Sequence, residues 1–248
     1  MKISFSPGWW LPVVDGLAPT RHGACGQVAL SIDDGPGAAT PDLLRLLRQH
    51  GARATFFLNG SRAAVRPDLV RAIADEGHAI QAHGWSHCPF GDGPAERVSR
   101  EMERTEAELA RVRPTPSPYL VRLPYASGHG QAHVHRALRR WRADCQIANW
   151  RLSLQDAAIA ARARSAADLE RMCGDAADTV LSDPRLEGAV VLARDDPFDV
   201  DSGYAVTASI AVVAAFLDGV ARQRLGVVAM QPVMTARPHV ARFIMVRQ

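Results

Sequence analysis

Residues 27–36 read Gln-Val-Ala-Leu-Ser-Ile-Asp-Asp-Gly-Pro, a short apolar run that ends in two acidic residues and a Gly-Pro turn. A helix start follows at Thr40, because threonine caps helices, Pro41 suits the first helical position and Asp42 favours the positive helix end. Gly51 is a typical residue just beyond a helix end. The stretch therefore predicts a strand, an acidic loop and a helix in succession.

The same alternation continues along the chain. Further strand-like segments cover residues 54–58, 78–82, 119–122, 144–148, 188–193 and 226–230. Helix-like segments cover residues 67–76, 102–112, 166–181 and 210–217. Strands that alternate with helices predict parallel strands in a wound or closed sheet. We expect a single-domain α/β fold, a distorted (β/α)7-type barrel over residues 27–248, with residues 1–26 as an N-terminal extension packed on it.

The composition is that of an ordinary globular protein, with 47% hydrophobic and 22% charged residues. Lys2 is the one lysine, so arginine supplies 28 of the 29 basic residues. These arginines are scattered rather than clustered with aromatic residues, and we expect no nucleic-acid partner. No stretch approaches the roughly 20 apolar residues of a membrane span. With no secretory signal evident and four cysteines that form no C-x-x-C pair, we expect a cytoplasmic protein.

Three groups of residues carry the chemistry. Asp33 and Asp34 are adjacent carboxylates, and two such anions repel each other unless a cation holds one of them. His83 and His87 have the i, i+4 spacing at which two imidazoles converge on one metal. Arg122, in the stretch Arg-Leu-Pro-Tyr, is a rigid donor suited to holding a carboxylate. Each group alone is also compatible with an ordinary role: a solvated turn, two unrelated histidines or a structural ion pair.

The shared position of the three groups favours a catalytic site. Each group lies where an apolar strand ends and a loop begins, and the active sites of α/β barrels are assembled from those loops. One aspartate and two histidines would form a metal-ligand set with open positions for water and substrate.

The motifs resemble those of the polysaccharide deacetylase family, carbohydrate esterase family four. That family's T-F-D-D-G-P is matched by residues 31–36, its H-(S/T)-x-x-H by residues 83–87 and its R-x-P-Y by residues 122–125. The second motif departs from the pattern only at Gly84. The likeness extends over about residues 27–230 and implies a metal-dependent hydrolase built on a (β/α) barrel.

The family resemblance also implies a role for each matching residue. Asp33 would be the general base, and Asp34, His83 and His87 would bind a divalent metal, most often Zn²⁺. Arg122 would hold Asp33 in place.

Two further positions are implied on the substrate side. The backbone N–H of Tyr125 would oppose the charge that develops on the oxyanion, and Tyr125 and Leu192 would contact the substrate. A backbone donor aimed at the developing charge acts in the transition state, where it accelerates the reaction.

The resemblance weakens at the fourth and fifth motifs. Asp156 stands at the expected aspartate, but Ala157 replaces a tryptophan. Arg194 stands where the family has the histidine that protonates the leaving amine, and Ala193 replaces a leucine. Arginine stays charged at any working pH, so it cannot act as a general acid.

Three explanations for Arg194 remain open. Asp33 could transfer both protons, another residue such as His129 could supply one, or the protein could be slow or inactive. We expect Arg194 to pair with Asp156 or to bind an anionic group of the substrate.

The resulting prediction is hydrolysis of an N-acetyl or other N-acyl group on a sugar or polysaccharide precursor, in bacterial surface-polysaccharide synthesis. The partner would be a carbohydrate, in one version an anionic one. The alternatives are a non-sugar amide hydrolase of the same fold and a non-catalytic carbohydrate-binding barrel.

Overall fold

The computed structural model describes residues 10–17, 26–198 and 200–231 of the chain. Within these ranges, nine strands form one sheet in the order β1-β6-β5-β4-β3-β2-β8-β7, and β9 pairs with the start of β2. Every strand pairing is parallel. The strands are β1 (Val13–Val14), β2 (Gln27–Asp33), β3 (Thr55–Leu58), β4 (Ala79–Ala82), β5 (Tyr119–Val121), β6 (Cys145–Ala148), β7 (Leu152–Ser153), β8 (Val190–Arg194) and β9 (Gly226–Val228).

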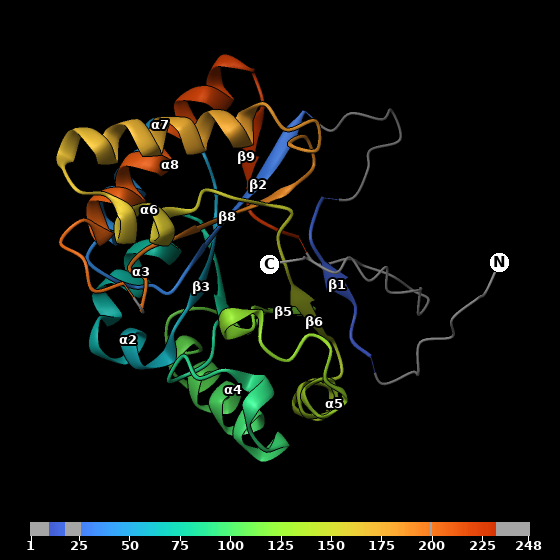
Figure 1. Ribbon diagram of the computed structural model, residues 1–248. Coiled ribbons are helices and arrows are strands. Elements are labelled where there is room, and N and C mark those ends of the chain that lie inside the picture. Colours follow the sequence, from blue (N-terminus) through green and yellow to red (C-terminus); the bar gives the residue numbers. More distant parts are fainter. Residues whose placement is uncertain (1–9, 18–25, 199, 232–248) are drawn as a thin grey trace.

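Helices cover the outside of the curled sheet, which gives the expected distorted (β/α)7-type barrel (Figure 1). They are α1 (Thr40–Gln49), α2 (Gly60–Val65), α3 (Pro67–Asp75), α4 (Ala95–Leu109), α5 (Ala132–Trp141), α6 (Asp156–Arg162), α7 (Ala166–Leu181) and α8 (Ala205–Arg222). Helices α7 and α8 lie together at one end of the molecule, and α4 and α5 lie at the other.

Alternation along the strands divides the core in two. On β2, Leu30 and Ile32 pack in the large cluster between sheet and helices, whereas Ala29 belongs to a small cluster on the opposite face. That small cluster draws one residue from each of several strands, among them Phe57, Leu120 and Val190. Side chains alternate with a period of two along a strand. Residues two or four positions beyond those of the small cluster therefore also point into the barrel interior.

The segment around β1 bridges two parts of the sheet. β1 pairs with β6, and Gly16 forms a bridge with Ala189, just before β8. Leu17 then donates its backbone N–H to the carbonyl of Gly188 over 2.8 Å. Of the N-terminal extension expected over residues 1–26, the structure describes residues 10–17 and 26, so the rest of that prediction lies outside the described residues.

The start of α1 differs from the prediction. Thr40 is the first helical residue rather than the N-cap, which is Ala39, and no side chain caps this helix. The reason is a competing partner. The Thr40 hydroxyl donates to the carboxylate of Asp195 and accepts from the N–H of Gly37. Thr40 thereby ties the loop after β2 to the loop after β8.

Helix α8 is the one described helix that is long and apolar enough to cross a membrane by length and composition. Half of its apolar window is buried inside the fold, and the helix packs against α7. The hydrophobic face of α8 therefore packs in the protein core.

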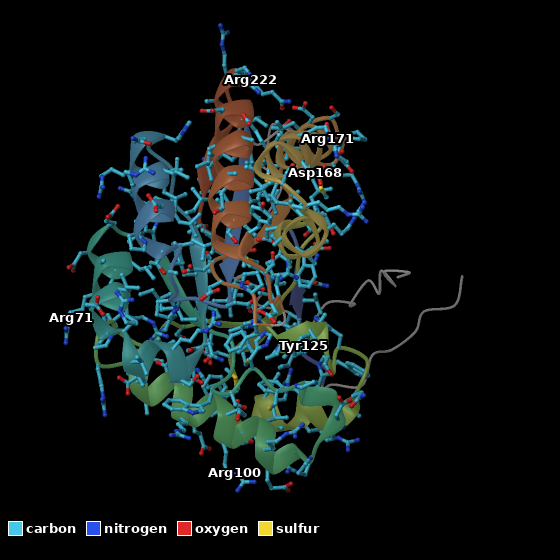
Figure 2. All side chains as sticks on the ribbon, turned by 60° about the vertical axis from the view of Figure 1, so that its left-hand side comes forward. Arg71, Arg100, Tyr125, Asp168, Arg171 and Arg222 are labelled. Carbon is cyan, nitrogen blue, oxygen red and sulfur yellow. The ribbon has the colours of Figure 1, made fainter. Side chains whose placement is uncertain are left out.

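Arginine side chains on separate helices point away from the body of the molecule. Figure 2 shows this for Arg71 on α3, Arg100 on α4 and Arg222 at the end of α8. Arg171 on α7 forms ion pairs with acidic residues of its own helix. That nucleic acid is not a partner stays a prediction from the composition.

Candidate metal centre and active site

Three ligand-type side chains meet at the carboxyl ends of β2 and β4. Asp34 follows β2 with a left-handed φ of 70°, and His87 has a φ of 57°. Oδ1 of Asp34 lies 3.3 Å from Nε2 of His83 and 3.1 Å from Nε2 of His87. All three residues are buried, and their ligand atoms lie within 4.8 Å of one another. The left-handed turns bring side chains together that a straight strand would direct to opposite faces.

The electrostatics of Asp34 favour a cation beside it. Burial raises the pKa of the Asp34 carboxyl, but hydrogen bonds and the nearby charge of His83 and His87 outweigh burial and hold this pKa well below its usual range. The carboxylate therefore stays ionised at neutral pH.

The orientation of His83 fits a metal ligand. Its Nδ1 lies 2.9 Å from the backbone carbonyl of Arg122, so the N–H that this oxygen requires must sit on Nδ1. A neutral ring with its proton on Nδ1 would present the lone pair of Nε2 to a metal beside Asp34. A carboxylate oxygen and two imidazole nitrogens, one of them fixed by an outer hydrogen bond, are a donor set that suits a divalent metal such as zinc.

The second carboxylate, Asp33, is held by a fully buried arginine. Nη1 of Arg122 donates to both carboxylate oxygens of Asp33, over 2.9 and 3.1 Å. Nε of Arg122 donates to the carbonyl of Ala148, and Nη2 lies within hydrogen-bond reach of the Ser31 hydroxyl. Burial lowers the pKa of Arg122, and the charge of Asp33 opposes that shift. The pair fixes Asp33 beside Asp34 without placing it in the ligand set.

Tyr125 lies at the mouth of the site, in a short 3-10 turn after β5. Its φ is 56° and half of the residue is exposed. The ring centroid lies 4.6 Å from that of His87.

These groups line one cavity of about 300 Å³. Its charged and polar lining comprises Asp33, Asp34, His83, His87, Tyr125 and Arg194. Its apolar lining includes Leu123, Trp150, Leu192, Phe198 and Val200. His129 is not among the lining residues, and burial lowers the pKa of its imidazole to about 4.

The fourth and fifth motifs meet as an ion pair. Asp156 is fully buried, and its carboxylate accepts from the backbone N–H of Arg194 and from Nη1 of Arg194, the latter over 2.8 Å. Nε of Arg194 lies 3.7 Å from Oδ2 of Asp34. The expected pairing of Arg194 with Asp156 is therefore present, and Arg194 also borders the metal-ligand set.

Strand alternation decides which residue of β8 faces the cavity. Leu192 and Arg194 line it, whereas Ala193 is buried in the core between sheet and helices. Ala157 also lines the cavity, where the family's tryptophan would stand. Leu192 is thus the apolar side chain that β8 contributes to the lining of the cavity.

Two residues near the centre carry no sequence motif. Arg62 on α2 donates Nη1 to the backbone carbonyls of Asp34 and Asp196. Phe198, in the loop after β8, stacks on the ring of His87. Neither has a spacing that would have pointed to the site, because Arg62 reaches it from helix α2 and Phe198 from the loop after β8.

Known proteins resemble this chain in sequence and in fold. Over 100 residues it is 39% identical to a peptidoglycan-N-acetylglucosamine deacetylase of Bacillus cereus, which covers 40% of this chain and 36% of that protein. Over 108 residues it is 37% identical to a chitin deacetylase of Colletotrichum lindemuthianum, which covers 41% of this chain and 43% of that protein. The chain thus spans less than half the length of these curated relatives.

A solved structure extends the likeness in fold. The peptidoglycan N-acetylglucosamine deacetylase Bc1960, crystallised with a hydroxamate-type benzamide, superposes with a TM-score of 0.71 at 24% identity, over 89% of this chain and 91% of that one. The model of the family described as polysaccharide deacetylase matches residues 20–172, more than half of the sequence. The chain belongs to the polysaccharide deacetylase family, carbohydrate esterase family four.

Proposed function

We propose that the protein is a zinc-dependent deacetylase that removes an N-acetyl group from an amino sugar of a polysaccharide or its precursor. The observation that carries this proposal is the arrangement of two carboxylates with different partners. Asp34 lies between His83 and His87, and Asp33 is held by Arg122. The names of the relatives, which include peptidoglycan and chitin deacetylases, support an N-acetylated sugar as the substrate.

Asp34, His83 and His87 would hold the metal, and Asp33 would act as the base. A divalent metal, when bound, polarises an acyl carbonyl and lowers the pKa of a water molecule. Asp33, which accepts two hydrogen bonds from Arg122, takes the proton of the attacking water. The backbone N–H of Tyr125 opposes the negative charge on the acyl oxygen.

The proton for the leaving amine comes from Asp33 in this proposal. Arg194 cannot release a proton at a working pH, and His129 does not line the cavity. Asp33 therefore receives the proton of the water and passes it to the amine nitrogen as the C–N bond breaks.

The position and charge of Arg194 favour an anionic substrate. It brings a fixed positive charge to the cavity wall, where its Nη1 is bound to Asp156 and its Nε borders Asp34. A uronate carboxylate or a phosphate beside the acetamido group would complement this charge. We place the reaction in bacterial surface-polysaccharide synthesis, and the cytoplasmic location stays a prediction.

The test combines metal analysis with acetate release. Purified protein is assayed for bound zinc and for acetate released from chitooligosaccharides, peptidoglycan fragments and uronate-containing N-acetylated sugars. Asp33→Asn should keep the metal and lose acetate release, whereas Asp34→Asn should lose both.

Other outcomes distinguish the alternatives. Bound metal with no hydrolysis across a broad set of acyl substrates would favour a non-catalytic carbohydrate-binding barrel. Hydrolysis restricted to amides without a sugar would favour an amide hydrolase of another substrate class. A protein that binds no divalent metal would contradict the proposal.

A further inference from the structure

The two histidines of the metal centre are oriented by different contacts. His83 has an outer hydrogen bond, from its Nδ1 to the carbonyl of Arg122. The Nδ1 of His87 is buried and has no hydrogen-bond partner among the described residues. The torsion that turns an imidazole ring about its bond to the chain is broad, so packing or hydrogen bonding must fix it.

Phe198 lies flat against the ring of His87. The two ring centroids are 4.3 Å apart and the planes are inclined by only 7°. On another side, the ring of Tyr125 meets His87 at 4.6 Å and 58°. A ring held between a parallel and a tilted neighbour cannot turn without a clash, so these contacts do for His87 what the hydrogen bond does for His83.

Arg62 fixes Phe198 from its other side. The guanidinium carbon of Arg62 lies 3.7 Å from the Phe198 ring centroid. The same guanidinium donates to the carbonyl of Asp34, over 2.8 Å, and to the carbonyl of Asp196. Arg62 thus joins the loop of one metal ligand to the loop that carries Phe198.

We propose that Phe198, clamped by Arg62, is the positioning residue that orients His87 for metal binding. The inference rests on the metal centre of the proposed function. Outer contacts of this kind commonly change metal affinity by about 10- to 100-fold when they are removed. The loop after β8, which lines the cavity, would therefore set the affinity of a ligand that follows β4.

The test measures zinc affinity of the whole protein by competition with a chromophoric chelator. Phe198→Leu keeps an apolar side chain of similar bulk but removes the flat stack, and it should weaken zinc binding about tenfold. Phe198→Tyr keeps the ring and should bind zinc with the affinity of the wild-type protein. The melting temperature of the metal-free protein should be the same for all three, which separates positioning from general stability.

Arg62→Lys tests the clamp while keeping the charge. It should weaken zinc binding in the same direction as Phe198→Leu, and the double variant should lose no more than Phe198→Leu alone, because Arg62 acts through Phe198. Arg66→Lys is the matched control. Arg66 lies just after α2, the helix that carries Arg62, and is paired with Asp68. Its replacement should change the zinc affinity by no more than about twofold.

The outcomes separate this inference from the proposed function. If wild-type protein binds zinc and Phe198→Leu binds it equally well, the positioning role is wrong and the metal centre stands. If wild-type protein binds no zinc, both are wrong. Additive losses in the double variant would show that Arg62 acts by another route and would overturn the clamp.

Discussion

Arg194 donates twice to Asp156, once from its backbone N–H and once from Nη1 over 2.8 Å. Burial raises the pKa of Asp156, and the charge and hydrogen bonds of Arg194 oppose that rise. Although burial opposes the shift, the nearby charge of Asp156 raises the pKa of the Arg194 guanidinium. Arg194 therefore stays positively charged on the cavity wall with Asp156 as its counterion, at a position where the family's histidine would exchange a proton.

Replacement of Arg194 by histidine should change substrate preference. The variant loses a fixed cation, so kcat/KM on anionic N-acetylated sugars should fall about tenfold relative to neutral chitooligosaccharides, because a hydrogen bond to a charged group contributes about 1.5 kcal/mol or more. Acetate release on matched neutral and uronate-containing substrates measures the ratio. Arg185→His, at an exposed pair with Asp183, is the control. An equal change on both substrates would rule out anion recognition by Arg194.

Replacement of Arg122 by methionine should destabilise the fold and abolish activity. Arg122 is fully buried, and its loss leaves the Asp33 carboxylate buried without its cation. Breaking such a pair costs about 3–5 kcal/mol. Urea unfolding of the metal-free protein measures this cost.

Arg185→Met serves as the control for stability, since its pair with Asp183 is exposed and should contribute at most about 1 kcal/mol. A loss from Arg122→Met no larger than this control would show that Arg122 does not hold Asp33 in place.

Much of the centre could be predicted from the sequence because the motifs follow strands. In a parallel sheet the carboxyl ends of strands lie at one edge, so residues after β2, β4 and β5 must come close together. The ends of β2 (Asp33), β4 (Ala82) and β5 (Val121) lie within a residue or two of the predicted ones. At these positions the local sequence pattern predicted the strand end, and the parallel topology brought the strand ends together.

The short elements could not be predicted in the same way. Helices α2 and α6 have six and seven residues, and their apolar spacing is too brief to separate a helix from a loop. Helix α5 was also missed, although it has ten residues and buries four of them. β1 and β7 have two residues each, and only their partners make them strands. The contacts of Arg62 and Phe198 depend on the tertiary path of two loops, which no local pattern encodes.

Zinc should stabilise the folded protein. A ligand that binds only the folded state adds about 2.7 kcal/mol at a free concentration 100 times its dissociation constant. The melting temperature should therefore rise with added zinc and fall with EDTA.

Asp34→Asn should abolish the zinc-dependent rise, because it removes the carboxylate that both histidines face. Asp33→Asn should keep the rise, since Arg122 rather than the ligand set holds Asp33. Equal zinc-dependent shifts in wild type and Asp34→Asn would show that the metal binds elsewhere.

His78 should make stability fall in mild acid. It is 7% exposed, its Nδ1 accepts from the N–H of Ala54, and burial, with the charge of Arg53, lowers its pKa to about 4. The unfolded chain takes up the proton near pH 6.5, so the stabilisation is fully present above that pH and is lost as pH falls towards about 4. The loss is on the order of 3 kcal/mol.

Urea unfolding of metal-free protein between about pH 7 and pH 4 measures this contribution. His78→Asn offers an acceptor to Ala54 without a group that titrates, so its stability should fall less steeply than that of wild type. The histidines of the metal centre are present in both proteins, so they cancel in the comparison. His129, whose pKa is also lowered to about 4 by burial, accounts for part of the slope that remains. Parallel curves for the two proteins would mean that His78 takes up its proton in the folded state as readily as in the unfolded chain.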